Sequence, residues 1–223
     1  METLAVLTLM LLSGPASATC LRLGPDPARP PVLCDVETYR QQAGTNGLPA
    51  YRPYRRSAFP HWISAGHAAN GCAITVRERV LIDESREPVT WAQCRIIRGR
   101  WADPYTGAVI TDPHALDVDH VVSLEDAWES GAWAWTPAAR TAYANDLADP
   151  DHLIAVSARE NRRKGARGPD AWTPPNPWRP ARCYYARVYH RIKRAWLLTE
   201  TPAEHAAEGR LCGVSHNAEG GRE

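Results

Sequence analysis

Two short segments that join apolar residues to a polar motif constrain this chain more than any other feature of its sequence. The first, residues 116–122, carries Asp117-Val118-Asp119-His120 before Val121 and Val122. The second, residues 153–156, is closely followed by Glu160-Asn161-Arg162-Arg163-Lys164. The apolar run 153–156 is typical of a buried β-strand, and residues 116–122 also have the pattern of a strand. We therefore expect two strands whose ends present a carboxylate, an imidazole, a carboxamide and several cations.

The sequence between and after these strands predicts helices. Residues 124–135 carry apolar or small residues at helical spacing, and Thr136-Pro137 is an N-cap and first-turn proline that opens a helix to about Asn145. Ser157-Ala158-Arg159-Glu160 has the form of a capping box, so a helix begins directly after the second strand and ends near Gly165. Asn161 should therefore lie in the first turn of that helix. Two further helices are expected, over residues 184–197 and from Thr201 to Leu211.

These residue types suit metal-assisted cleavage of a phosphodiester bond. Carboxylate and carboxamide oxygens are ligands for hard divalent cations, so Asp119 and Asn161 are candidate metal ligands. A neutral imidazole accepts a proton from water, which makes His120 the candidate general base. Adjacent residues of a regular strand point to opposite faces, and we therefore expect a bend or bulge that brings Asp119 and His120 to one site.

Charge is distributed unevenly, although the formal net charge is only +1. Residues 159–194 contain eleven Lys and Arg residues and two carboxylates, whereas residues 112–151 contain nine carboxylates and one Arg. A basic segment folded beside an acidic, metal-binding one suits a phosphodiesterase. Any single Arg is more often part of a solvated helix face, so the prediction depends on the cluster. The candidate nucleic-acid-binding residues are Arg162, Arg163, Lys164 and Arg167.

The two motifs together resemble the ββα-metal (His-Me finger) core of the HNH endonucleases. They are similar both to the HNH domain of RNA-guided CRISPR nucleases and to the GmrSD-type HNH proteins secreted by bacteria. The likeness to the secreted group covers roughly residues 50–212, through the additional motifs Asn70-Gly71-Cys72, Asp103-Pro104-Tyr105-Thr106-Gly107, Asp126-Ala127-Trp128 and Trp172-Thr173-Pro174-Pro175-Asn176. The later metal-binding histidine of the HNH name has no match after Asn161, which favours magnesium or manganese over tightly bound zinc.

The resemblance implies an α+β fold with a ββα-metal nuclease core, a helical insertion between its two strands, and helical flanks joined by disulfides. It implies Asp119 as metal ligand, His120 as general base, Asn161 as the remaining metal-site residue and Lys164 as a phosphate contact. The function implied is a secreted endonuclease that hydrolyses phosphodiester bonds of nucleic acid, DNA in the first place, by a one-metal mechanism. Its cofactor would be Mg²⁺ or Mn²⁺, and we expect a monomer with no stable membrane association.

The first residues of the chain predict export. Residues 4–12 form an apolar run too short to span a bilayer, and Ala16-Ser17-Ala18 is an A-x-A cleavage pattern. We divide the chain into a signal peptide (1–18), a Pro-rich arm (19–49), the nuclease domain (50–212) and a polar tail (213–223). Lipidation of Cys20 is the alternative to simple secretion, but residues 17–19 match a lipobox poorly.

The cysteines agree with an oxidising compartment. The chain contains six, at widely spaced positions with no C-x-x-C pair, which favours structural disulfides over a zinc ribbon. Six cysteines allow fifteen pairings, and the sequence does not choose among them. The nearest-neighbour scheme is Cys20–Cys34, Cys72–Cys94 and Cys183–Cys212.

Two other function classes compete with the nuclease. A non-catalytic module that binds extracellular nucleic acid or the cell envelope on a nuclease-like fold is the main alternative, although intact Asp119, His120 and Asn161 argue against degeneration. A peptidase or other hydrolase lacks support, because the chain contains neither G-x-S-x-G nor H-E-x-x-H. Trp172 and Trp178, beside the basic segment, are candidates for stacking on bases, although tryptophans by default pack in the core.

Overall fold

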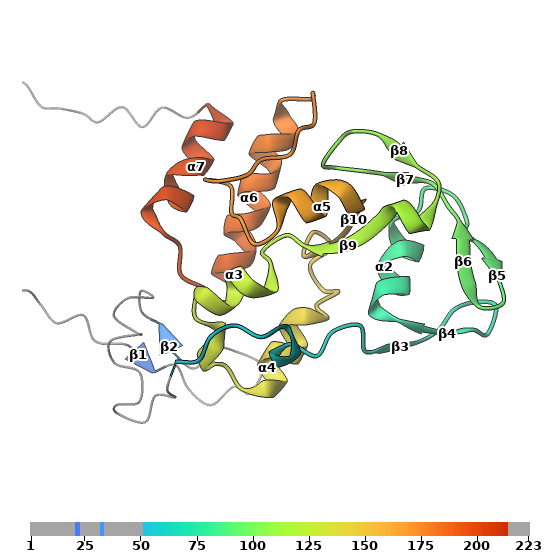
Figure 1. Cartoon of the computed structure of the whole chain (residues 1–223), viewed down its shortest axis with the longest axis horizontal. Helices are drawn as coiled ribbons and strands as arrows, with labels where there is room; N and C mark the ends of the chain where they lie inside the picture. The colour runs from blue at the N-terminus through green and yellow to red at the C-terminus, as the bar shows by residue number, and fades with distance from the viewer. Residues whose placement is uncertain (1–20, 23–31, 34–50, 214–223) are drawn as a thin grey trace, which may run out of the picture.

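The computed structural model describes residues 21–22, 32–33 and 51–213, as short antiparallel strand pairs combined with helices (Figure 1). The first pair joins β1 (Leu21–Arg22) to β2 (Val32–Leu33). The predicted signal peptide, most of the Pro-rich arm, nearly all of the polar tail and the Cys20–Cys34 pair lie outside the described residues. No helix within the described ranges is long and apolar enough to cross a membrane.

The centre of the fold is a two-stranded unit followed by a helix, as the sequence predicts (Figure 1). β9 (Leu116–His120) pairs antiparallel with β10 (Leu153–Ser157), in a register that opposes Leu153 to His120 and Ser157 to Leu116. α5 (Ala158–Lys164) begins at once after β10 and ends at Gly165, whose φ of 58° few other residues adopt. This unit carries every residue predicted for the candidate metal site.

The predicted capping box at the start of α5 is wrong. Ser157 makes no side-chain hydrogen bond to the first turn of the helix. The carboxylate of Glu160 lies instead 3.2 Å from the Nη1 atom of Arg163, one turn further along the helix. β10 runs directly into α5. The last pair of the β9–β10 strand pairing, Ser157 with Leu116, therefore fixes where the helix begins, and no side-chain cap does so.

The two faces of the β9–β10 pair have different neighbours. One face supplies alternate apolar residues to a core shared with α2 (Val76–Glu84), and these are Leu116, Val118, Leu153 and Ala155. Asp117 and Asp119 occupy the alternate positions of β9, and Ile154 and Val156 oppose them on β10. Strand alternation therefore separates an apolar face toward α2 from a face that carries two carboxylates.

Helices fill the connection between β9 and β10, as expected. α3 (Leu124–Glu129), the 3₁₀ helix η3 (Ala132–Ala134) and α4 (Pro137–Ala144) lie there in sequence. The single helix predicted over residues 124–135 is wrong, because the chain breaks at Gly131 with φ 124°. The capped start of α4 is confirmed, since the Thr136 hydroxyl accepts a hydrogen bond from the Ala139 amide.

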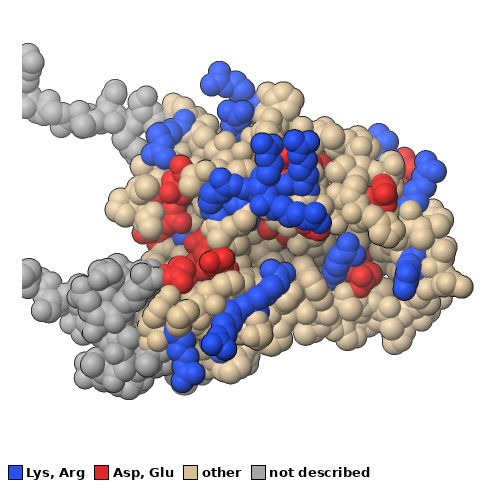
Figure 2. Space-filling model, viewed as in Figure 1, with Lys and Arg blue, Asp and Glu red and all other residues tan. Residues whose placement is uncertain are grey.

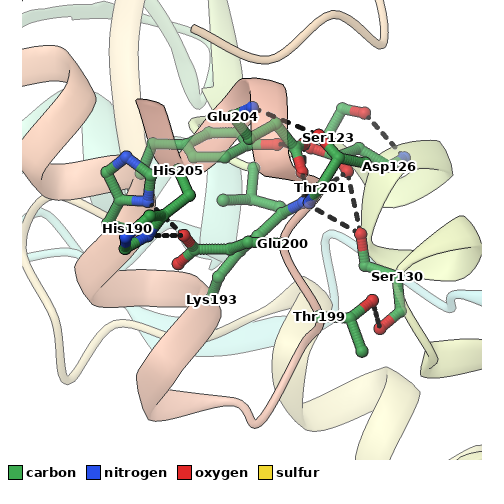
Figure 3. A network of polar contacts seen from close by, with 12 residues as sticks. Ser123, Asp126, Ser130, His190, Lys193, Thr199, Glu200, Thr201, Glu204 and His205 are labelled. Carbon is green, nitrogen blue, oxygen red and sulfur yellow. Dashed lines mark hydrogen bonds and ion pairs between the residues drawn. The ribbon is translucent and has the colours of Figure 1, made fainter. Parts of the chain in front are cut away.

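The C-terminal flank is a pair of helices, α6 (Pro180–Ala195) and α7 (Pro202–Cys212), joined by the Cys183–Cys212 disulfide. α6 begins before the predicted start at residue 184. The amine of the buried Lys193 side chain lies 2.9 Å from the Ser130 hydroxyl, 3.0 Å from Asp126 and 2.8 Å from Glu204 (Figure 3). This network joins α6 and α7 to α3, the helix that directly follows β9.

The N-terminal half of the described chain is built from small hairpins around α2, on the right in Figure 1. After the 3₁₀ helix η1 (Arg56–Ala58) come β3 (Ser64–His67), β4 (Ala73–Thr75), β5 (Thr90–Ala92), β6 (Arg95–Arg98), β7 (Trp101–Ala102), β8 (Val109–Ile110) and the 3₁₀ helix η2 (Pro113–Ala115). Cys72 and Cys94 form a disulfide between two of these hairpins. Two pairs of the nearest-neighbour scheme are thus confirmed.

Candidate active site

One cavity of about 300 Å³ is lined by Asp119, His120 and Asn161 together. The first two come from the end of β9 and the third from the middle of α5. The start of α3 and the segment around Arg56 supply part of the remaining wall. The fold therefore brings together the three residues on which the sequence-based prediction depends.

The bend or bulge expected between Asp119 and His120 is not present. The pairing with β10 continues without a register shift to His120, the last residue of β9. Asp119 faces Lys164 of α5, whereas the His120 ring lies beside Trp62, which packs against the core on the α2 side. Both residues still line the cavity, because it lies at the end of the strand, where side chains from both faces reach it.

The imidazole of His120 is held in one tautomer by a backbone carbonyl. Its Nε2 atom lies 3.0 Å from the carbonyl oxygen of Ala144, which only accepts hydrogen bonds. Nε2 therefore carries the proton, and Nδ1 carries the lone pair. The ring is packed between the rings of Trp62 and Tyr143, with centroid distances of 5.6 Å and 6.3 Å. Burial, and then the nearby His152, lower the pKa of His120 well below its usual range, which favours the neutral, proton-accepting form.

Asp119 is buried and accepts hydrogen bonds from two side chains. The Tyr105 hydroxyl donates to its Oδ2 atom at 2.6 Å, and the Lys164 amine lies 2.8 Å from the same atom and 3.1 Å from Oδ1. Burial raises the pKa of the Asp119 carboxyl, and the Lys164 ammonium opposes this effect. Burial and the neighbouring carboxylate raise the pKa of Tyr105 well above its usual range, so this hydroxyl remains a donor.

Lys164 does not occupy the surface position expected of a phosphate contact. Its side chain has no exposed area, and its amine donates to the backbone carbonyl of His120 at 2.9 Å as well as to Asp119. Its contacts are thus with the candidate catalytic residues themselves. The other three candidate nucleic-acid-binding residues, Arg162, Arg163 and Arg167, are exposed. Figure 2 shows Lys and Arg side chains gathered in the middle of the face on which α5 lies.

Asn161 is oriented by a residue that the sequence-based site did not include. Its amide nitrogen donates to the carboxylate of Asp117 at 3.2 Å, and the guanidinium of Arg162 lies 3.8 Å from the same carboxylate oxygen. This contact leaves the carboxamide oxygen of Asn161 as the end available to a cation. Asp117 could have been found from strand alternation, because it shares a face of β9 with Asp119. Tyr105 lies in the motif Asp103–Gly107 of the family resemblance, but fourteen positions separate it from Asp119, so the motif did not indicate this contact.

The donor set of the cavity fits a hard divalent cation. Asp119 offers a carboxylate and Asn161 a carboxamide, which are the oxygen ligands that Mg²⁺ and Mn²⁺ prefer. Among the described residues, no group of three or more His, Cys, Asp and Glu side chains is placed to hold a metal ion. A cation held by Asp119 and Asn161 would keep positions for water and substrate.

Residues 77–207 match the family of GmrSD restriction endonucleases, C-terminal domain. The chain belongs to this family. The matched residues include Asp119, His120, Asn161 and Lys164, so the core of the candidate site is part of the GmrSD C-terminal domain. The segment around Arg56, which forms one wall of the cavity, precedes the matched residues.

A curated protein of similar sequence is a relative of this GmrSD C-terminal domain protein. An uncharacterized secreted protein of Arthroderma benhamiae is 39% identical over 156 residues, which cover 69% of this chain and 72% of the relative. Together with the two disulfides of the described residues, this relative confirms the prediction that the protein is secreted. No solved structure matches the chain.

Proposed function

We propose that the protein is a secreted HNH-type endonuclease that hydrolyses phosphodiester bonds of nucleic acid, with β9, β10 and α5 as its ββα-metal core. The observation that carries the proposal is the shared cavity of Asp119, His120 and Asn161, in a domain of a restriction endonuclease family. Two oxygen ligands and one imidazole of fixed tautomer are the groups that a one-metal hydrolysis needs.

His120 is the general base of this proposal. Because Ala144 fixes the proton on Nε2, the Nδ1 lone pair accepts a proton from the water that attacks phosphorus in line with the leaving oxygen. The packing of the ring against Trp62 and Tyr143 keeps the imidazole in this orientation. Positioned proton transfer of this kind contributes a factor of about 10² to 10⁴ to the rate.

Asp119 and Asn161 would hold a divalent cation, which would neutralise charge on the scissile phosphate and on the leaving oxygen. Lys164 fixes Asp119 from the side opposite to solvent, and Asp117 holds the carboxamide nitrogen of Asn161. Arg162, Arg163 and Arg167, exposed on and just after α5, bind the phosphates that flank the scissile bond. Lys164 is therefore assigned to positioning and the three arginines to substrate binding.

The proposal is tested by digestion of nucleic acids under controlled metal supply. The mature protein is stripped of metal with a chelator and incubated with supercoiled plasmid, single-stranded DNA and RNA, each with Mg²⁺, Mn²⁺, Ca²⁺ or Zn²⁺. We expect cleavage of at least the plasmid with Mg²⁺ or Mn²⁺, abolished again by excess chelator. Retention of DNA without cleavage under every cation would contradict the proposal and favour a binding module instead.

A further inference from the structure

A second cavity lies on the same side of the β9–β10 pair and has a different character. It measures about 340 Å³, within the range of small-molecule sites, and its lining is largely apolar and aromatic. Tyr105, Trp178, Tyr184 and Tyr185 contribute their rings, and Ile154 of β10 forms part of the wall. Ile154 is the register partner of Asp119, so both project from the same face of the strand pair.

This aromatic cavity is connected to the candidate catalytic cavity through one side chain. Tyr105 lines the aromatic cavity and donates its hydroxyl to Asp119, which lines the catalytic cavity. The buried Tyr105 side chain thus lies between the aromatic cavity and the catalytic carboxylate.

Two aromatic side chains of the cavity are exposed to solvent, and the hydroxyl of one of them, Tyr184, donates to Asp151 of the cavity wall at 2.7 Å. Trp178 is 66% exposed and Tyr184 is 54% exposed, and both are among the few large apolar side chains with this exposure in the described chain. They belong to the start of α6 and the loop before it, where Arg179 and Arg182 are also exposed. Exposed aromatic rings among arginines are typical of surfaces that bind unpaired bases.

Tyr185 presents its ring, and not its hydroxyl, to the cavity. The Tyr185 side chain is 4% exposed, and its buried hydroxyl makes no hydrogen bond with any described residue. Because this hydroxyl has almost no accessible surface, a base in the cavity meets the ring of Tyr185.

We propose that the aromatic cavity binds an unpaired nucleobase of the substrate, stacked on the exposed rings of Trp178 and Tyr184. This inference rests on the proposed function, because it takes nucleic acid as the ligand. It assigns substrate recognition to the start of α6, outside the strand–strand–helix unit that carries the catalytic residues. Base stacking at this site holds single-stranded or locally opened substrate next to Asp119.

The test is equilibrium binding of short DNA oligonucleotides in excess chelator, so that no cleavage takes place. One oligonucleotide is single-stranded with all bases, and a second has the same length and charge but abasic sites. The wild type should bind the base-bearing strand more tightly. Trp178→Ala should weaken that binding at least about fivefold and leave binding of the abasic strand unchanged. Ile97→Ala, which removes a side chain 47% exposed on β6, is the matched control.

A second variant tests the other exposed ring of the cavity. Tyr184→Ala should weaken binding of the base-bearing strand and leave binding of the abasic strand unchanged. Equal binding of the base-bearing strand by Trp178→Ala and Ile97→Ala would overturn the proposal. Cleavage of plasmid by the wild type would in that case still support the nuclease, so the two failures are distinguishable.

Discussion

The amine of Lys164 lies 2.8 Å from the carboxylate of Asp119, and the two side chains are 0% and 7% exposed. The same amine donates to the His120 carbonyl, so one side chain joins the last turn of α5 to the end of β9. These two elements carry both proposed cation ligands and the proposed base. The ion pair therefore fixes the relative position of the residues that the proposed reaction uses.

Loss of this ion pair should destabilise the protein strongly. Lys164→Met keeps the length of the side chain but leaves the Asp119 carboxylate buried without its cation, which costs about 3–5 kcal/mol of the free energy of unfolding. The measurement is denaturant unfolding at neutral pH. Arg163→Met, which changes a cation 61% exposed one residue earlier, is the control and should change stability by less than about 0.5 kcal/mol. Equal midpoints for the two variants would refute a structural role for the pair.

Stability should also depend on the protonation of Glu84, at the end of α2. Burial raises the pKa of this carboxyl to about 7, although it accepts a hydrogen bond from the Ala155 amide. An unfolded chain releases the proton near pH 4.5 and the folded chain near pH 7, so the folded state binds more protons in this window. The Glu84 contribution is therefore complete below pH 4.5 and is lost as the pH rises through 7.

Glu84→Gln checks this dependence, because glutamine keeps the acceptor for Ala155 and cannot ionise. The free energy of unfolding is measured at pH 5 and pH 8. The fall between them should be smaller in the variant than in the wild type, by at most about 3 kcal/mol. Glu87→Gln, at a carboxylate 66% exposed, should leave the wild-type fall unchanged. A Glu84→Gln profile identical to that of the wild type would show that the carboxyl titrates normally.

Asp117 should influence cation binding without being a ligand itself. Asp117→Ala frees the carboxamide of Asn161 to rotate, and loss of such an orienting contact typically costs about 10- to 100-fold in metal affinity. The Mg²⁺ concentration at half-maximal cleavage should rise accordingly. Asp112→Ala, at a carboxylate 65% exposed near η2, should leave that concentration at the wild-type value. A wild-type Mg²⁺ dependence in Asp117→Ala would remove Asp117 from the site.

The exposed arginines on and just after α5 should account for binding to phosphate. Arg162→Ala and Arg167→Ala should each weaken DNA binding about equally for all sequences, and each should lower the slope of log affinity against log salt by about one. Binding is measured in chelator at several salt concentrations. Arg79→Ala is the control, because Arg79 is held by Asp83 on α2, away from the cavity. A slope unaffected by the first two substitutions would place the substrate elsewhere.

The strand–strand–helix unit was predictable because its signals are local. The strands and the end of α5 at Gly165 each depend on a few consecutive residues. The same holds for α4 in the connection, which begins at Thr136-Pro137. The break at Gly131 was missed because apolar spacing continues across it, and the absent cap at Ser157 was missed because the ladder sets the start of α5 instead.

The site was predictable only in its ligand types. Asp119, His120 and Asn161 were identified from their chemistry, but the partners that orient them come from distant segments. Tyr105 and the carbonyl of Ala144 reach the site through tertiary packing, which no local pattern encodes. The expected bulge shows the same limit. The sequence predicts correctly that Asp119 and His120 point to opposite faces of β9, but it does not predict that the cavity lies at the end of the strand, where both side chains reach it.

The most direct measurement is the single-turnover rate of plasmid cleavage by His120→Ala with saturating Mg²⁺, compared with His114→Ala. His114 is a histidine of the same segment whose side chain is 83% exposed, so it controls for the loss of an imidazole. We predict that His120→Ala binds DNA like the wild type in chelator but cleaves about 10² to 10⁴ times more slowly, while His114→Ala cleaves at the wild-type rate. Cleavage by His120→Ala at the wild-type rate would contradict the assignment of the general base and the mechanism built on it.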